Sequence, residues 1–133
     1  MIVVGYIPDQ FGTAALEHAI AEAKLRDTSL LVINTSKGDS LTDPRFAQGD
    51  ELRALEERLA ASGVEYELTH EFGVDAASTL LNAMERDDAE LLVLGLRHRN
   101  PVGKMLLGST AQHLLLECPK PVLAVKPEEH RRP

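Results

Sequence analysis

Five short apolar runs alternate with four longer stretches of helical periodicity along the 133 residues of this chain. The apolar runs cover residues 2–6, 30–34, 64–68, 91–95 and 122–126. Strands that alternate with helices pair in parallel, because each helix carries the chain back across a face of the sheet. The pattern therefore predicts one α/β domain over 1–133, with a doubly wound five-stranded parallel sheet and four helices. Residues 127–133 are expected to be a flexible tail.

Each stretch between the strands gathers its apolar residues on one helical face, which predicts a helix packed on the sheet. The four stripes are Leu16, Ile20 and Ala23; Leu52, Leu55 and Leu59; Ala77, Leu80, Leu81 and Met84; and Ala111, Leu114, Leu115 and Cys118. The only cysteine, Cys118, lies on the last stripe and is expected to be a buried structural thiol.

The third apolar run differs from the others because it alternates. Val64, Tyr66 and Leu68 share one face, and Glu65 and Glu67 share the other. A strand covered on one face only belongs at an edge of a parallel sheet. Of the two common orders, 2-1-3-4-5 buries the third strand and 3-2-1-4-5 places it at an edge. The sequence therefore predicts the order 3-2-1-4-5.

In that order the fifth strand forms the opposite edge. Its residues Val122, Leu123, Ala124 and Val125 carry no charge. An uncharged apolar edge invites pairing with another strand. We therefore predict a homodimer that forms through the last strand.

The charge balance and composition exclude several kinds of partner. The chain has 14 Lys and Arg against 21 Asp and Glu, a net charge of −7, which argues against a general nucleic-acid binder. No apolar stretch approaches the roughly 20 residues that a membrane helix needs. A single cysteine and the absence of a signal-peptide pattern at the start lead us to expect a cytoplasmic protein.

A basic segment interrupts this acidic chain after the fourth predicted strand. Residues 96–104 contain Arg97, Arg99 and Lys104 and no acidic residue. In the predicted order the first and fourth strands are neighbours, and the direction of winding reverses between them. Open α/β sheets bind ligands at that position. The loops 7–12 and 96–108 are therefore expected to enclose a ligand crevice.

Gly95 precedes the basic segment, and Gly108, Ser109 and Thr110 end it at the start of the fourth predicted helix. Glycine lets a backbone approach a phosphate, and a helix N-terminus favours an anion. Ser109 and Thr110 can cap the helix or donate to the anion. The residues alone also fit simple turns with solvated charges. Their place at the expected crevice favours phosphate binding, with charge from the basic segment.

Familiar catalytic motifs are not present. Lys104 follows a glycine, but Met105 stands where a phosphate-binding loop of the Walker A type needs Ser or Thr. Ser109 lacks the second glycine of a nucleophile elbow. His70 and Glu71 end the third predicted strand without a third partner. We predict no catalytic residue and no metal site, and the sequence does not decide whether the protein is an enzyme.

The span 91–126 resembles the signature of the universal stress protein family (UspA-like). That signature is a glycine, two residues, a second glycine, nine residues, and then a glycine followed by Ser or Thr. Here it corresponds to Gly95, His98, residues 99–107, Gly108 and Ser109. The last strand, flanked by Pro119 and Pro121, also resembles the family, and the likeness extends over the whole length.

This resemblance implies an adenine nucleotide alpha hydrolase-like fold, a regulatory role in stress and dimerisation through the last strand. The implied ligand is ATP, possibly with Mg²⁺, and any hydrolysis is expected to be slow and incidental. The implied nucleotide-binding residues are Ile7, Asn34, Gly95, Arg97, His98, Lys104, Gly108, Ser109 and Thr110.

Three of these residues depart from the family pattern. His98 replaces the second signature glycine, Ile7 replaces an aspartate at the end of the first strand, and Asn34 replaces an apolar residue that packs on the base. Two hypotheses follow. The chain is either an ATP-binding regulator with an arginine-rich variant of the loop, or a homodimeric interaction module whose nucleotide site has decayed.

Overall fold

The computed structural model describes residues 1–7, 10–35, 49–71, 75–96 and 108–126. Five strands and four helices alternate along the chain. They are β1 (Ile2–Tyr6), α1 (Gln10–Arg26), β2 (Leu30–Thr35), α2 (Asp50–Ala61), β3 (Tyr66–Glu71), α3 (Ala76–Met84), β4 (Leu91–Gly95), α4 (Ser109–Glu117) and β5 (Val122–Val125). The predicted α/β class and the number of elements are confirmed for these residues. The predicted tail, 127–133, lies outside the described residues.

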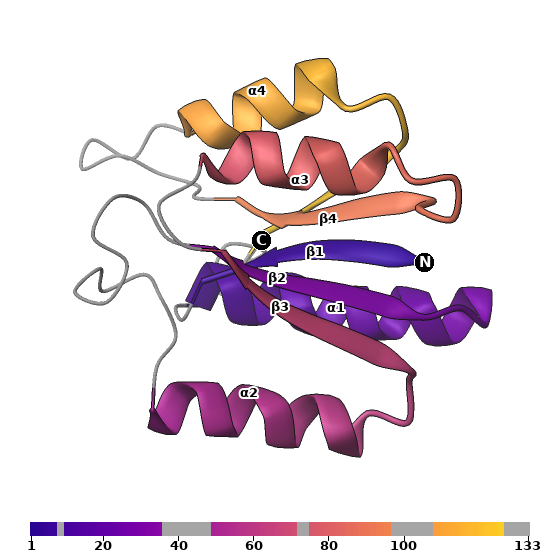
Figure 1. Ribbon diagram of the computed structural model, residues 1–133, viewed down its shortest axis with the longest axis vertical. Coiled ribbons are helices and arrows are strands. Elements are labelled where there is room, and N and C mark those ends of the chain that lie inside the picture. Colours follow the sequence, from indigo (N-terminus) through magenta and orange to yellow (C-terminus); the bar gives the residue numbers. More distant parts are fainter. Residues whose placement is uncertain (8–9, 36–48, 72–74, 97–107, 127–133) are drawn as a thin grey trace, which may run out of the picture.

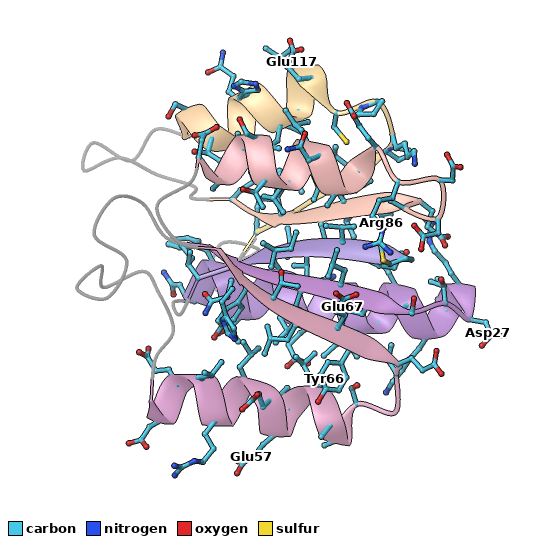
Figure 2. The ribbon with its side chains drawn as sticks, viewed as in Figure 1. Asp27, Glu57, Tyr66, Glu67, Arg86 and Glu117 are labelled. Atoms are coloured by element: carbon cyan, nitrogen blue, oxygen red, sulfur yellow. The ribbon has the colours of Figure 1, made fainter. Side chains whose placement is uncertain are left out.

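The five strands form one parallel sheet with the order β3-β2-β1-β4-β5, as the sequence predicted. β3 lies at one edge and β5 at the other. Tyr66 and Glu67 leave β3 on opposite sides, Tyr66 toward α2 (Figure 2). The alternation in the third apolar run therefore reports the edge position correctly.

Helices cover both faces of the sheet (Figure 1). The apolar faces of α1 and α2 pack on the side that includes Val4, Val32 and Val93. The apolar faces of α3 and α4 pack on the other side, against Val3 and Leu92 among others. The sheet thus lies between two cores, as expected for strands whose residues are apolar on both faces. The carboxyl ends of the strands and the starts of α1 and α4 share one end of the molecule (Figure 1).

Three strands differ from their predicted ranges: β5 ends at Val125 in place of residue 126, and the other two are β2 and β3. β2 continues to Thr35, and β3 covers Tyr66–Glu71 in place of 64–68. The ladder between these strands pairs Leu30 with Tyr66 and continues to Thr35 with Glu71. Main-chain pairing needs no apolar side chains, so β3 extends through polar residues where the apolar run has ended. His70 and Glu71 are therefore part of the strand, not of the segment after it.

The predicted stripe on the fourth helix is only partly buried. Leu114 is buried, but Leu115 is 37% exposed and Cys118 is half-buried at the C-terminal end of α4. α4 packs against α3, and Leu114 is the residue of this helix that is buried in the core. The prediction of a buried thiol at Cys118 was therefore too strong.

Candidate functional site

The site predicted at the carboxyl end of the sheet has the expected topology. β1 and β4 are adjacent, and the chain continues from β1 to α1 on one face and from β4 to α4 on the other. This arrangement is the switch point at which open α/β sheets bind ligands. Both helices begin on the side where the strands end (Figure 1).

Gly95 and Gly12 allow the start of α1 to pack closely over the ends of β1 and β4. A Cβ atom on Gly95 would collide with the main-chain carbonyl oxygen of Phe11. A Cβ atom on Gly12 would collide with the carbonyl oxygen of Ile7, which is half-buried after β1. Packing of the protein itself therefore explains Gly95, which the sequence had assigned to a phosphate.

Gly108 has no such structural reason to be glycine. It is the N-cap of α4 with φ −64° and ψ 157°, a conformation open to any residue, and an added Cβ would meet nothing within 4 Å. As the N-cap it provides no side-chain hydrogen bond to the helix. Ser109 is already the first helical residue, so neither Ser109 nor Thr110 is the N-cap of α4, which was one of the two roles that the sequence allowed them.

The start of α4 leaves main-chain donors available. The first hydrogen bond within the helix joins the Gln112 N–H to the Gly108 oxygen at 3.0 Å. The N–H groups of Ser109, Thr110 and Ala111 precede it, as at any helix start. Among the described residues none of these three groups has a hydrogen-bond partner. Gly108 and Ser109 are exposed and Thr110 is half-buried, so these donors lie near solvent.

The two helices away from the switch point carry acidic residues at their starts. Asp50 and Glu51 occupy the first turn of α2, and Asp75 caps α3 by accepting from the Ser78 N–H at 3.0 Å. Neither α1 nor α4 has an acidic residue in its first turn. A carboxylate at a helix start offsets the positive end of the helix dipole. Among these helix starts, that of α4 thus remains suited to an external anion.

A polar pair lies farther along the same end of the sheet. Asn34 on β2 is fully buried, and its side-chain nitrogen lies 3.3 Å from Nδ1 of His70 on β3. The register pairs Asn34 with His70 on one side and with Tyr6 on the other. The sequence had named Asn34 as a site residue and had given His70 no such role. Their contact joins positions 36 residues apart, and only the strand register shows it.

Three predicted site residues, Arg97, His98 and Lys104, lie outside the described residues. The structure places Ile7, Asn34, Gly95, Gly108, Ser109 and Thr110 at the carboxyl end of the sheet. None of these six is charged, so the described part of the site offers main-chain donors and neutral side chains.

The surface hollows of the described residues lie away from this site. Two open hollows of about 440 Å³ each share Ser29, Val64 and Glu65, at the amino ends of β2 and β3 and so at the opposite end from the switch point. Within the described ranges no group of three His, Cys, Asp or Glu residues could hold a metal ion. No helix among them is long and apolar enough to cross a bilayer.

Comparison with known proteins identifies the family. The model of the universal stress protein family matches residues 1–126. A universal stress protein of Mycolicibacterium smegmatis is 64% identical over 127 residues, which cover 96% of this chain and 98% of that relative. The chain belongs to the universal stress protein family. A universal stress protein of Mycobacterium tuberculosis is 33% identical and matches 98% of this chain, but the match covers 49% of that longer relative.

Solved structures of universal stress proteins share the fold. One from Archaeoglobus fulgidus is 27% identical, with a TM-score of 0.69 over 94% of this chain and 97% of the other. An Archaeoglobus fulgidus universal stress protein in complex with dAMP gives a TM-score of 0.62 at 24% identity over 94% and 96% of the two chains. Another universal stress protein, in complex with cAMP, gives 0.71 at 21% identity over 96% of each chain.

Proposed function

We propose that this universal stress protein binds an adenine nucleotide, with ATP as the leading candidate, at the carboxyl end of its sheet. The proposal rests on the conformation and surroundings of Gly108. It leaves the start of α4 uncapped and open at the switch point, and nothing in the protein's own packing requires glycine there. A phosphate is the ligand that such a helix start favours.

In this proposal the phosphates contact the N–H groups at the start of α4, together with the hydroxyls of Ser109 and Thr110. Arg97 and Lys104 supply positive charge, His98 lies beside the phosphates, and Mg²⁺ accompanies ATP. The adenosine extends over the ends of β1 and β2, near Ile7 and Asn34. Universal stress proteins of the same fold in complex with dAMP and with cAMP support an adenine nucleotide as the ligand class.

In this proposal the protein is a cytoplasmic regulator that acts as a homodimer, with β5 as the interface. β5 is an edge strand of uncharged residues, and α4, which precedes it in the chain, exposes Leu115 and Leu116 by 37% and 74%. A second copy would cover this apolar edge. The free Cys118 agrees with a reducing compartment.

Two substitutions at Gly108 separate folding from binding. Asp and Asn are both good N-caps, so Gly108→Asp and Gly108→Asn should fold at least as well as the parent. Gly108→Asn should weaken ATP binding about tenfold by crowding the phosphate, and Gly108→Asp roughly a hundredfold because it adds a charge of the same sign. Calorimetric titration with millimolar ATP and Mg²⁺ measures both. Unchanged affinity in a folded Gly108→Asp protein, or no heat with the parent, contradicts the proposal.

The second candidate is an interaction module without a nucleotide, which one observation favours. Asn34 replaces an apolar base-packing residue and is fully buried against His70, so the end of β2 has a polar contact within the protein. Identification of the small molecules released from the protein as purified, together with titration of the stripped protein, distinguishes the candidates. A bound adenine nucleotide supports the first, and dimers that bind none support the second.

A further inference from the structure

One side of the main chain of β3 is open, because β2 is its only neighbour among the described strands. The N–H of Leu30 on β2 donates to the oxygen of Glu65 at 2.9 Å. Glu65 and every second residue after it therefore turn their main-chain groups toward β2. The main-chain groups of Tyr66 and Leu68 point the other way. Among the described residues none pairs with these two on that side.

The two faces of this open edge carry different side chains. Tyr66 points toward α2 and is 39% exposed, and Leu68 is half-buried against the core on the same side (Figure 2). Glu67, and Glu65 just before the strand, alternate with them and are exposed. In the described part of the chain no ion pair includes either glutamate. The edge thus has an apolar face and an acidic face.

A hollow of about 440 Å³ adjoins the acidic face. Its lining includes Glu65 and Glu67, together with Arg86 and Asp88 from the turn after α3. Arg86 donates to the two carboxylate oxygens of Asp88 at 3.2 and 3.3 Å, so this pair balances its own charge. The two glutamates are not balanced in this way, and the hollow beside them suits a cationic side chain.

These features favour one kind of occupant. Antiparallel pairing with the same edge of a second copy would bring the glutamates of the two chains together, and like charges across a strand pair are destabilising. A foreign strand with basic residues on one face and apolar residues on the other matches both faces of the edge. Strands added to a sheet edge bind through the main chain and are selected by alternate side chains. The net charge of −7 also attracts a basic segment from a distance.

We propose that the open edge of β3 binds an extended segment of a partner protein in which basic residues alternate with apolar ones. The segment adds a strand beside β3 and pairs with the main chain of Tyr66 and Leu68. Its basic side chains face Glu65 and Glu67, and its apolar side chains pack beside Tyr66. Two strands separate β3 from β4, which leads to the proposed phosphate site, and the inference does not depend on nucleotide binding.

The first test uses a short labelled peptide of alternating lysine and valine. Fluorescence anisotropy should show saturable binding, and a peptide with glutamate in place of lysine should not bind. Two N-methylated forms, on all lysines or on all valines, keep the charge and remove the hydrogen-bond donors of one edge each. One of these two forms should fail to bind. Equal affinity of both methylated forms and the parent peptide would show attraction by charge alone and overturn the proposal.

A matched pair of double variants tests the acidic face. Glu65→Gln with Glu67→Gln should weaken binding of the lysine peptide about fivefold, the effect of two exposed ion pairs. The control is Glu56→Gln with Glu57→Gln, which removes the same charge from α2, where Glu57 points away from the sheet (Figure 2). The control should keep the affinity of the parent. An equal loss in both double variants would assign binding to net charge and overturn the proposal.

Hydrogen exchange of the parent locates the bound segment without any substitution. The amides of Tyr66 and Leu68 should exchange more slowly when the lysine peptide is bound. Those of Glu67 and Thr69, which face β2, should not change. Slowing of all four amides, or of none, contradicts pairing at this edge. A peptide that does not bind at millimolar concentration would show that the glutamates only keep the edge unpaired, and would also overturn the proposal.

Discussion

Gly95 and Gly108 flank the same sequence signature but have different physical roles. Gly95 is half-buried against the main chain of Phe11, where there is no room for a side chain. Gly108 is exposed, with ordinary dihedral angles and open space around it. At the scale of single residues, the first glycine is explained by folding and the second by the proposed ligand.

Replacement by alanine should therefore cost much more stability at Gly95 than at Gly108. Gly95→Ala should lower the free energy of unfolding by about 1–3 kcal/mol, because α1 must move away from β4. Gly108→Ala should change it by less than about 1 kcal/mol, the difference between these residues as N-caps. Urea unfolding of both variants measures the contrast. Equal stability of Gly95→Ala and the parent would contradict the close packing seen here.

At the scale of elements, an ion pair joins the first two helices. Arg58 on α2 donates from Nε and Nη2 to the two carboxylate oxygens of Glu17 on α1, at 2.7 and 2.6 Å. These hydrogen bonds lower the pKa of Glu17 below its ordinary value of 4.5, against a smaller opposing effect of burial. α2 buries only Leu55 and Leu59, so this pair adds to a small apolar contact.

The stability provided by this pair should depend on pH. Because the folded-state pKa of Glu17 is lowered, the contribution is complete above pH 4.5 and is lost as pH falls through the folded-state pKa. Both side chains are about 40% exposed, so the pair contributes at most about 1 kcal/mol. Arg58→Gln should destabilise the protein at pH 7 and have little effect near pH 3, as thermal unfolding at both values would show. An equal loss of stability at both pH values would show that Arg58 acts through packing and not through the ion pair.

A lysine connects the turns at the other end of the sheet. Lys120, between α4 and β5, donates from Nζ to the main-chain oxygens of Arg86 at 2.6 Å and Ala89 at 2.7 Å. Lys120→Met keeps the apolar stem and removes both bonds, which should cost about 1–2 kcal/mol. Chemical denaturation measures the loss, with Lys126→Met, exposed after β5, as the control. Similar stabilities of the two variants would contradict this role.

At the scale of the whole molecule, the side of β5 that faces away from β4 is where a second copy could pair. The N–H groups of Leu92 and Leu96 donate to the oxygens of Pro121 and Val125, so alternate residues of this segment face β4. The main-chain groups of Val122 and Ala124 therefore point toward the open edge. They are the groups that a second copy would pair with.

Ala124→Pro removes a donor from that open edge and leaves the bonds to β4 intact. If β5 forms the dimer interface, this variant should sediment as a monomer at micromolar concentration, while the parent and Ala124→Val sediment as dimers. A monomeric parent would refute dimerisation at this concentration. A dimeric Ala124→Pro protein would place the interface elsewhere.

The sequence predicted the sheet better than the site. Two glutamates in one short run, Glu65 and Glu67, were enough to place β3 at an edge and so to fix the strand order. The end of β3 was missed because apolar residues stop at Leu68, whereas main-chain pairing continues to Glu71. The contact of Asn34 with His70 was not predictable, because it depends on the register of two strands and leaves no local pattern.

In the proposed function, phosphates bind at the start of α4. The most direct measurement follows the backbone amide signals of Ser109, Thr110 and Ala111 by ¹⁵N NMR during titration with ATP and with tripolyphosphate. These three signals should shift with both ligands, while those of Ser78 and Thr79 at the carboxylate-capped start of α3 should not. If ATP leaves the α4 signals unchanged, or shifts the two helix starts equally, no phosphate site exists there.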